Sequence, residues 1–228
     1  MINHNSENYH GLGDEWLVEY AAGGLSYAKR FMIACQAALK SDLRQRLQFA
    51  DEFGATFVES APAQELSDQF YDQLGRQIDD NPAQSNRTQS NHSKPTDDAN
   101  EFAWAPKPLI ELIAAMGDQF SWKNTGGVQR ATLGEFDGDR LYLLKSKPGL
   151  KLPKHSHSGE EWALVLHGGY HANGVAYKPG DLHCENASCT HQPIIDDHDD
   201  GCISLITDEG KLQFSNPLMR AIQPFIGI

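Results

Sequence analysis

A polar stretch near the middle of the chain divides it into two parts. Residues 79–100 read DDNPAQSNRTQSNHSKPTDDAN, and none of the aliphatic residues there is larger than alanine. So little apolar surface cannot offset the entropy that is lost when a chain becomes ordered. We therefore expect a helical domain over residues 1–78, a flexible linker over residues 79–100 and a second domain over residues 101–228.

The part before this stretch has the periodicity of α-helices, because apolar residues recur three or four positions apart. The first helix is expected to stop at Gly23-Gly24, a typical helix end. The stripes are Trp16, Leu17, Tyr20, Ala21; then Leu25, Ala28, Met32, Cys35, Leu39; then Leu43, Leu47, Ala50 and Phe53 or Phe57; then Leu66, Phe70, Leu74, Ile78. Helices this short have a marginal core, so we expect a small bundle with an exposed apolar groove or a partner protein.

The part after the stretch changes to short β-type runs between glycine-rich breaks. The runs cover residues 128–133, 141–144, 162–166 and 203–206, and a short helix is expected around residues 109–116. This spacing predicts an all-β sandwich or barrel. The fold class is therefore an α+β multidomain chain, in which a small N-terminal helical bundle precedes an all-β domain.

Composition limits the partners and the compartment. Lys and Arg number 19 against 31 Asp and Glu, a net charge of −12, which repels nucleic-acid backbones and anionic lipid and favours a basic partner. The sequence shows neither a long apolar run nor a secretion signal, so we expect a cytoplasmic protein without direct contact to nucleic acid or membrane. The four cysteines, Cys35, Cys184, Cys189 and Cys202, are then expected to be reduced thiols.

A pattern of histidine and glutamate predicts a metal site in the second part. His155 and His157 are two residues apart, so on a strand both imidazoles leave the same face, and Glu161 keeps that parity. The most economical fourth ligand is His191, ten residues after a turn-like Lys-Pro-Gly-Asp that ends at Asp181. Imidazole and carboxylate ligands suit zinc, iron, manganese, nickel or copper. We predict one divalent metal at these four residues, with zinc as the expected ion.

The remaining histidines and cysteines are weaker candidates for ligands. His183 follows Gly180-Asp181 too closely to reach across a sheet, and His198 stands in an acidic run that is typical of a solvated loop. Cys184 and Cys189 form a C-x4-C pair, outside the common C-x2-C zinc spacing, so we do not predict a second metal there. The other histidines set aside are His167 and His171.

The metal pattern resembles a known superfamily. Gly149-x5-His155-x-His157-x3-Glu161-x6-Gly168, followed by Gly180-Asp181 and His191, resembles the two metal-binding motifs of the cupins. In the second motif, Asn186 and Ser188 replace the expected proline and glycine. The resemblance implies a cupin-type β-barrel that holds the metal inside.

The whole chain, from about Trp16 to its end, resembles the ChrR-type anti-sigma factors. The resemblance lies in EYAAGGL at residues 19–25, in the cupin motif, and in the closing LQF at 212–214 and QPFIGI at 223–228. In that family a helical domain sequesters an extracytoplasmic-function sigma factor, and the cupin domain is needed for its release. The resemblance implies a transcriptional regulator that frees its sigma factor on an oxidative or small-molecule signal.

One feature of that family is missing here. Zinc-containing anti-sigma domains carry an H-x3-C-x2-C run, and the matching positions are Cys35, Leu39 and Asp42, with His10 nearby. Because Leu39 cannot bind a metal, we expect no zinc in the helical part, with Leu39 filling the vacated core.

Two other functions stay open on the residues alone. A metal-dependent cupin oxygenase or hydrolase, with the helices as a dimerisation cap, would use the same metal as a Lewis acid or oxygen activator. Beyond Glu160, which points away from the predicted ligands, and Tyr142, the sequence offers no convincing acid, base or nucleophile, which favours a regulator over an enzyme. A structural or storage cupin without a partner is the third reading, and a homodimer is compatible with all three.

Overall fold

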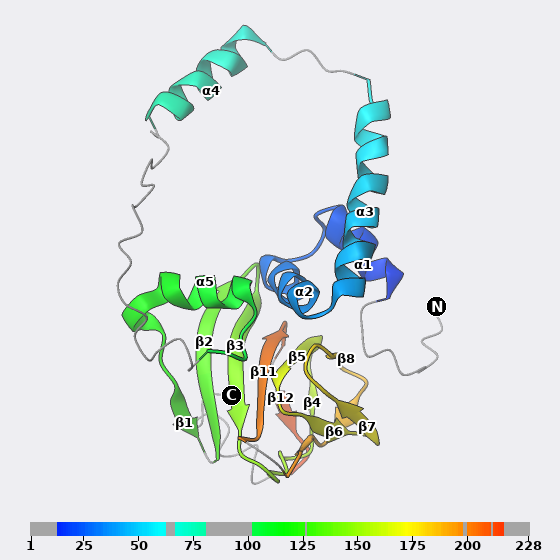
Figure 1. Cartoon of the computed structure of the whole chain (residues 1–228), viewed down its shortest axis with the longest axis vertical. Coiled ribbons are helices and arrows are strands. Elements are labelled where there is room, and N and C mark those ends of the chain that lie inside the picture. Colours follow the sequence, from blue (N-terminus) through cyan, green and yellow to red (C-terminus); the bar gives the residue numbers. More distant parts are fainter. Residues whose placement is uncertain are drawn as a thin grey trace. The chain divides into compact units, whose positions relative to one another are not determined.

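The structure is a computed structural model that describes residues 13–62, 67–80, 102–125, 127–197, 200–210 and 212–216. Contacts divide the chain into two compact units (Figure 1), one made of Met1–Glu52 with Trp104–Ile228 and the other of Phe53–Ala103. Most of the predicted linker lies outside the described residues, and its first two residues end a helix. The predicted domain boundaries therefore stay a prediction, although contacts place the first two helices in one unit with the strands.

The helices expected before the linker are present among the described residues. They are α1 (Asp14–Ala21), α2 (Tyr27–Leu39), α3 (Ser41–Ser60) and α4 (Asp68–Asp80). Helix α1 ends before Gly23, whose φ of 73° suits glycine. Helix α2 begins after Ser26, whose hydroxyl accepts a hydrogen bond from the Lys29 amide and so caps the helix. None of the described helices is both long and apolar enough to cross a membrane.

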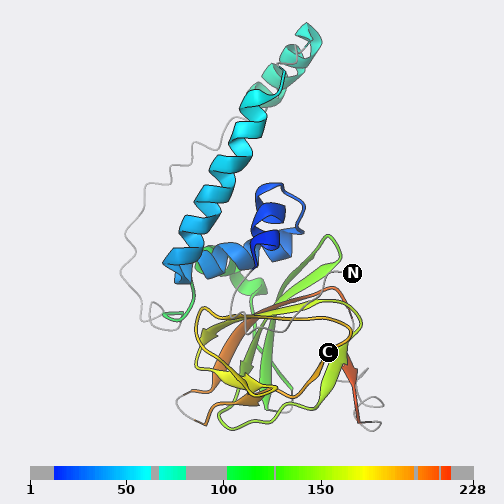
Figure 2. The ribbon, with the colours of Figure 1, turned by 90° about the vertical axis from the view of Figure 1, so that its right-hand side faces the viewer.

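The second part consists of short antiparallel strands in three sheets (Figures 1 and 2), as its alternating pattern predicted. The six-stranded sheet has the order β1 (Lys123–Thr125), β2 (Val128–Phe136), β3 (Asp139–Ser146), β11 (Cys202–Asp208), β5 (Glu161–His167), β8 (Leu182–Glu185). The two three-stranded sheets have the orders β10 (Ile194–Ile195), β6 (Tyr170–Ala172), β7 (Val175–Tyr177) and β12 (Leu212–Phe214), β4 (His155–His157), β9 (Thr190–His191). Residues of all three sheets line one internal cavity, so they enclose a common interior.

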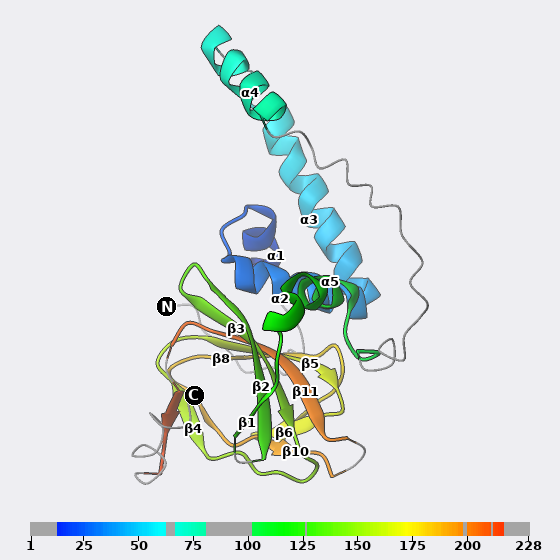
Figure 3. The same ribbon diagram turned by 90° about the vertical axis from the view of Figure 1, so that its left-hand side faces the viewer.

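Helix α5 (Lys107–Met116) lies beside α2 at one end of the six-stranded sheet (Figure 3). Leu109 and Ile113 of α5 are buried, as are Met32, Ile33 and Cys35 of α2. The thiol of Cys35 is buried and contacts the backbone of Leu109, so Cys35 lies in this interface. Burial raises the pKa of Cys35 to about 12. The first helices thus pack on the β domain through an apolar core.

The prediction that Leu39 fills a vacated core position is wrong. Leu39 is 38% exposed, because it is the last residue of α2 and lies beyond the buried stretch of that helix. The core positions of α2 are taken by Met32, Ile33 and Cys35, which are fully buried. The core of this helix is therefore complete without a leucine at its end.

Candidate metal centre

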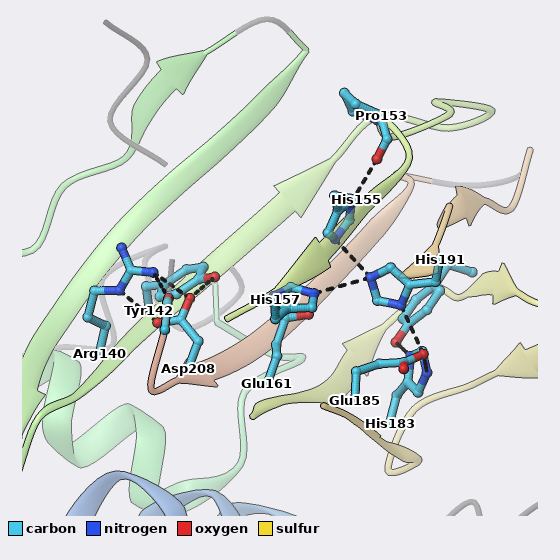
Figure 4. A network of polar contacts seen from close by, with 12 residues as sticks. Arg140, Tyr142, Pro153, His155, His157, Glu161, His183, Glu185, His191 and Asp208 are labelled. Carbon is cyan, nitrogen blue, oxygen red and sulfur yellow. Dashed lines mark hydrogen bonds and ion pairs between the residues drawn. The ribbon is translucent and has the colours of Figure 1, made fainter. Parts of the chain in front are cut away.

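The structure brings the four predicted ligands together (Figure 4). His155, His157, Glu161 and His191 are all buried, and each offers one nitrogen or oxygen atom within 4.8 Å of the others. Strand pairing explains the arrangement, since β4 lies antiparallel to β9 with His155 directly opposite His191. His157 is two residues further along β4 on the same buried face, and Glu161 begins β5.

Three imidazoles point toward one another at the centre of this group. The Nε2 atom of His191 lies 2.8 Å from Nε2 of His155 and 3.4 Å from Nε2 of His157. The carboxylate of Glu161 lies 3.5 Å from Nδ1 of His157. Burial first, and then the neighbouring imidazoles, lower the pKa of His155 to about 4 and of His157 to about 3, so both rings are neutral at pH 7.

Two of the imidazoles have a hydrogen-bond acceptor beside Nδ1, on the side away from the centre. Nδ1 of His155 lies 2.7 Å from the Pro153 carbonyl oxygen, and Nδ1 of His191 lies 3.0 Å from the Glu185 carboxylate. When each ring carries a single N–H, on the Nδ1 that faces these oxygens, both Nε2 atoms present lone pairs. Two lone pairs 2.8 Å apart repel each other unless a cation lies near both. These residues therefore fit a bound divalent metal.

The carboxyl group of Glu161 also fits a cation. Burial raises its pKa to about 8, and the negative charges of Asp208 and Glu185 add to the effect. Asp208 itself is held by Arg140 through two hydrogen bonds of 2.7 and 2.8 Å and accepts a third from Tyr142 at 3.1 Å. A buried carboxyl in such surroundings becomes an anion readily when a metal ion compensates its charge.

Two buried residues beside the centre were not predicted. His183 and Glu185 lie on β8 and, with His191, form a second group of nitrogen and oxygen atoms within 4.8 Å. His183 was set aside as too close to a turn to reach across a sheet, and this reasoning was wrong, because β8 pairs directly with β5 and borders the centre from that side. The sequence contained a signal for them. His183 and Glu185 are two residues apart, like His155 and His157, so on a strand both side chains leave the same face.

Glu185 is an anion that two histidines surround. Burial alone would raise its pKa, but hydrogen bonds from His183 and His191 outweigh that effect, with a further bond from the Cys189 thiol, so that its pKa is lowered. The charge of Glu185 is thus retained in a buried place, where an unpartnered carboxylate would be costly.

The other candidate residues are not part of this group of four. Glu160 faces Lys29 of α2 at 2.8 Å, on the side opposite to Glu161, as strand parity predicted. His171 pairs with Asp196 at 2.7 Å and is mostly exposed, and the Cys202 side chain is buried in the core. His10 and His198 lie outside the described residues, and so do residues 217–228 of the closing segment.

A largely apolar cavity of about 380 Å³ adjoins the centre. The residues of its wall include His155, Glu161, His191 and Tyr142, together with aliphatic residues such as Leu144, Leu152 and Ile195. Tyr142 is no acid near neutral pH, because burial, followed by the charges of Glu161 and Asp208, raises its pKa well above the ordinary value. The cavity has room for a small molecule next to the ligands.

Known proteins match both parts of the chain. Residues 112–211 match the family model of the ChrR cupin-like domain. The chain is 28% identical over 224 residues to the anti-sigma-E factor ChrR of Cereibacter sphaeroides, covering 96% of this chain and 98% of that protein. The chain is a homologue of ChrR. This confirms the resemblance that the sequence motifs indicated.

A solved structure of ChrR has the same fold. The crystal structure of Rhodobacter sphaeroides SigE in complex with the anti-sigma ChrR matches with a TM-score of 0.68 and 26% identity, over 87% of this chain and 97% of that chain. The likeness to ChrR therefore includes the helices that precede the cupin domain as well as the strands. The predicted fold class, N-terminal helices followed by a cupin domain, is confirmed, with the described strands arranged in three sheets.

Proposed function

We propose that this chain is an anti-sigma factor that sequesters an extracytoplasmic-function sigma factor and carries a zinc ion at His155, His157, Glu161 and His191. The observation that carries the proposal is the extent of the likeness to ChrR, which covers 96% of the chain, helices included. A cupin enzyme that shared the barrel alone would lack this likeness in the helices. Because sigma factors act on RNA polymerase, the proposal places the chain in the cytoplasm.

The second half of α3 supplies a surface that suits a protein partner. Phe53 and Phe57 are 56% and 61% exposed, and Val58 is 77% exposed. The rings of Phe53 and Phe57 lie edge to face with centroids 5.1 Å apart, one helical turn from each other. Exposed aromatic residues on one helix are typical of a surface that a partner covers. The net charge of −12 would speed the encounter with a basic partner.

The donor set supports zinc as the metal. Three imidazole nitrogens and one carboxylate oxygen are ligands that zinc accepts in proteins, and four ligands suit its coordination number. Zinc bound there would hold β4, β5 and β9 together as a structural crosslink. In this proposal the adjoining cavity is where a small molecule or oxidant reaches the centre and triggers release. The expectation of no zinc at Cys35, Leu39 and Asp42 stays part of the proposal.

Co-expression tests the sigma partner. The full chain, carrying an affinity tag, is produced together with each extracytoplasmic-function sigma factor of its own organism, and we expect one of them to be retained in a 1:1 complex. A Phe53→Ser, Phe57→Ser double variant should lose at least tenfold in affinity, whereas Ile194→Ser, at an exposed apolar residue on β10, should bind normally. Failure of a folded full chain to retain any such sigma factor would refute the proposal.

Elemental analysis tests the metal. Protein purified from its own organism should contain about one zinc ion per chain, and His157→Ala should contain far less. Iron or copper together with oxygen uptake would instead favour the cupin oxygenase. A folded wild-type chain without bound metal would refute the metal centre.

A further inference from the structure

We propose that Glu185, held in turn by His183 and Tyr170, is a positioning residue that fixes His191 as a metal ligand. The inference rests on the metal centre of the proposed function and does not depend on the sigma partner. It concerns residues behind the ligands, on the side of β8.

A continuous chain of hydrogen bonds leads away from His191 (Figure 4). Oε1 of Glu185 lies 3.0 Å from Nδ1 of His191 and 2.7 Å from Nε2 of His183. Nδ1 of His183 lies 2.9 Å from the hydroxyl of Tyr170. All four residues are buried, so these groups rely on one another.

The carboxylate of Glu185 sets the direction of the hydrogen bonds on either side of it. A carboxylate only accepts, so the two ring nitrogens that face Glu185 must carry hydrogen. With the single N–H of a neutral ring placed there, Nδ1 of His183 carries a lone pair that can accept the hydrogen of the Tyr170 hydroxyl. Nε2 of His191 is likewise a lone pair, and it points at His155 and His157. The hydrogen bond to Glu185 thus engages Nδ1 of His191 and leaves Nε2 as the nitrogen that faces the proposed metal position.

Stacked rings hold this network in place. The ring of His183 lies on that of Tyr177, with centroids 4.2 Å apart and planes inclined by 20°. Tyr177 stacks in turn on Tyr170, at 5.1 Å and 24°. Because His183 and Tyr170 are clamped by Tyr177, the carboxylate of Glu185 has a fixed anchor from which it orients His191.

The same residues offer a competing interpretation, a second metal between His183, Glu185 and His191. The distances argue against it. Separations of 2.7 and 3.0 Å to a single oxygen are those of hydrogen bonds, and each donor in the network already has an acceptor. A second ion would have to displace two hydrogens from a completed network.

Removing the carboxylate should weaken metal binding without unfolding the protein. Partners behind a metal-bound histidine fix its tautomer and raise its basicity, and their loss typically costs about 10–100-fold in affinity. We therefore expect Glu185→Gln to raise the zinc dissociation constant of the full chain about 10–100-fold, measured by chelator competition at pH 7. Tyr170→Phe removes the far end of the network. It should also raise the zinc dissociation constant, but by a several-fold smaller factor than Glu185→Gln.

Glu160→Gln is the matched control, because Glu160 is a nearby acid that faces Lys29. It should leave the zinc affinity unchanged. The melting temperature of each metal-free variant shows whether the fold survives. If Glu185→Gln does not fold, nitrogen-15 NMR of the zinc-loaded wild type is the deciding measurement. The inference requires that His191 carries its hydrogen on Nδ1, the nitrogen that faces Glu185.

Three results would overturn the inference: an affinity of Glu185→Gln within threefold of wild type, hydrogen on Nε2 of His191, or two zinc ions per wild-type chain. If wild type binds no zinc, the inference fails together with the metal centre. If Glu185→Gln weakens zinc binding but no sigma factor is retained by the wild type, the inference stands and the anti-sigma role fails.

Discussion

Lys29 on α2 forms an ion pair at 2.8 Å with Glu160, the residue directly before the proposed ligand Glu161. Its ammonium group also pairs with Glu209 and lies 5.3 Å from the ring centroid of Trp162. The Lys29 side chain is nearly buried, and the two carboxylates more than offset the effect of burial, so its pKa is raised. One side chain of the helical segment is thus fixed to the strand that carries a metal ligand.

This pairing predicts a loss of stability when Lys29 is replaced. Lys29→Met leaves the carboxylates of Glu160 and Glu209 without this cation, and hydrogen bonds to charged groups contribute about 1.5–3 kcal/mol. We expect the free energy of unfolding to fall by about 1–3 kcal/mol in urea denaturation and the amides of α2 to exchange faster. Lys107→Met is the control, because its pair with Glu111 is exposed and should change stability by less than about 0.5 kcal/mol. Equal effects of the two substitutions would contradict the prediction.

Metal removal should destabilise the wild type through linkage. A ligand at 100 times its dissociation constant stabilises the folded state by about 2.7 kcal/mol, provided that the unfolded chain does not bind it. We expect a chelator to lower the melting temperature of the wild type and to leave that of His157→Ala unchanged. A wild-type melting temperature that stays constant while the metal is removed would show that the ion adds nothing to stability.

Metal binding at pH 7 should release about one proton from Glu161. The metal-free carboxyl has a pKa of about 8 and is therefore mostly protonated at pH 7, whereas a ligand must be an anion. The release should vanish above about pH 9, where the carboxyl is already ionised. Calorimetric titrations in buffers of different ionisation enthalpy measure it, and Glu161→Gln should release no proton. Equal proton release by wild type and Glu161→Gln would assign the proton to another group.

Gly168 should tolerate no side chain. A Cβ atom added there would lie 1.8 Å from the carbonyl oxygen of Gly201, and its φ of 68° is unfavourable for other residues. Gly174→Ala is the control, since Gly174 has a φ of 82° but open space around it, so alanine meets backbone strain of about 1–2 kcal/mol without a clash. We expect Gly168→Ala to be destabilised well beyond Gly174→Ala in thermal denaturation.

Local rules predicted the helices, the four longest strands and the proximity of the four proposed ligands. The parity of residues 155, 157 and 161 depends only on strand geometry, and a hairpin-length connection was enough to propose His191. Glu185 and His183 were missed because their position depends on the pairing of β8 with β5, which a local pattern does not determine. The error at Leu39 has a similar origin, since helical periodicity does not say where on the helix the buried contact ends.

The attachment of α2 to the strands affects how the sigma-binding part can be isolated. Besides Lys29, Gln36 donates a hydrogen bond to the Gly180 carbonyl at 3.0 Å and Lys40 pairs with Asp181 at 3.1 Å. A fragment that ends at residue 78 would lose these partners and uncover Met32 and Ile33, which the whole chain keeps away from water. Such a fragment would expose an apolar face that can bind other proteins non-specifically. Any protein that the fragment captures would therefore have to be compared with the proteins that the full chain binds.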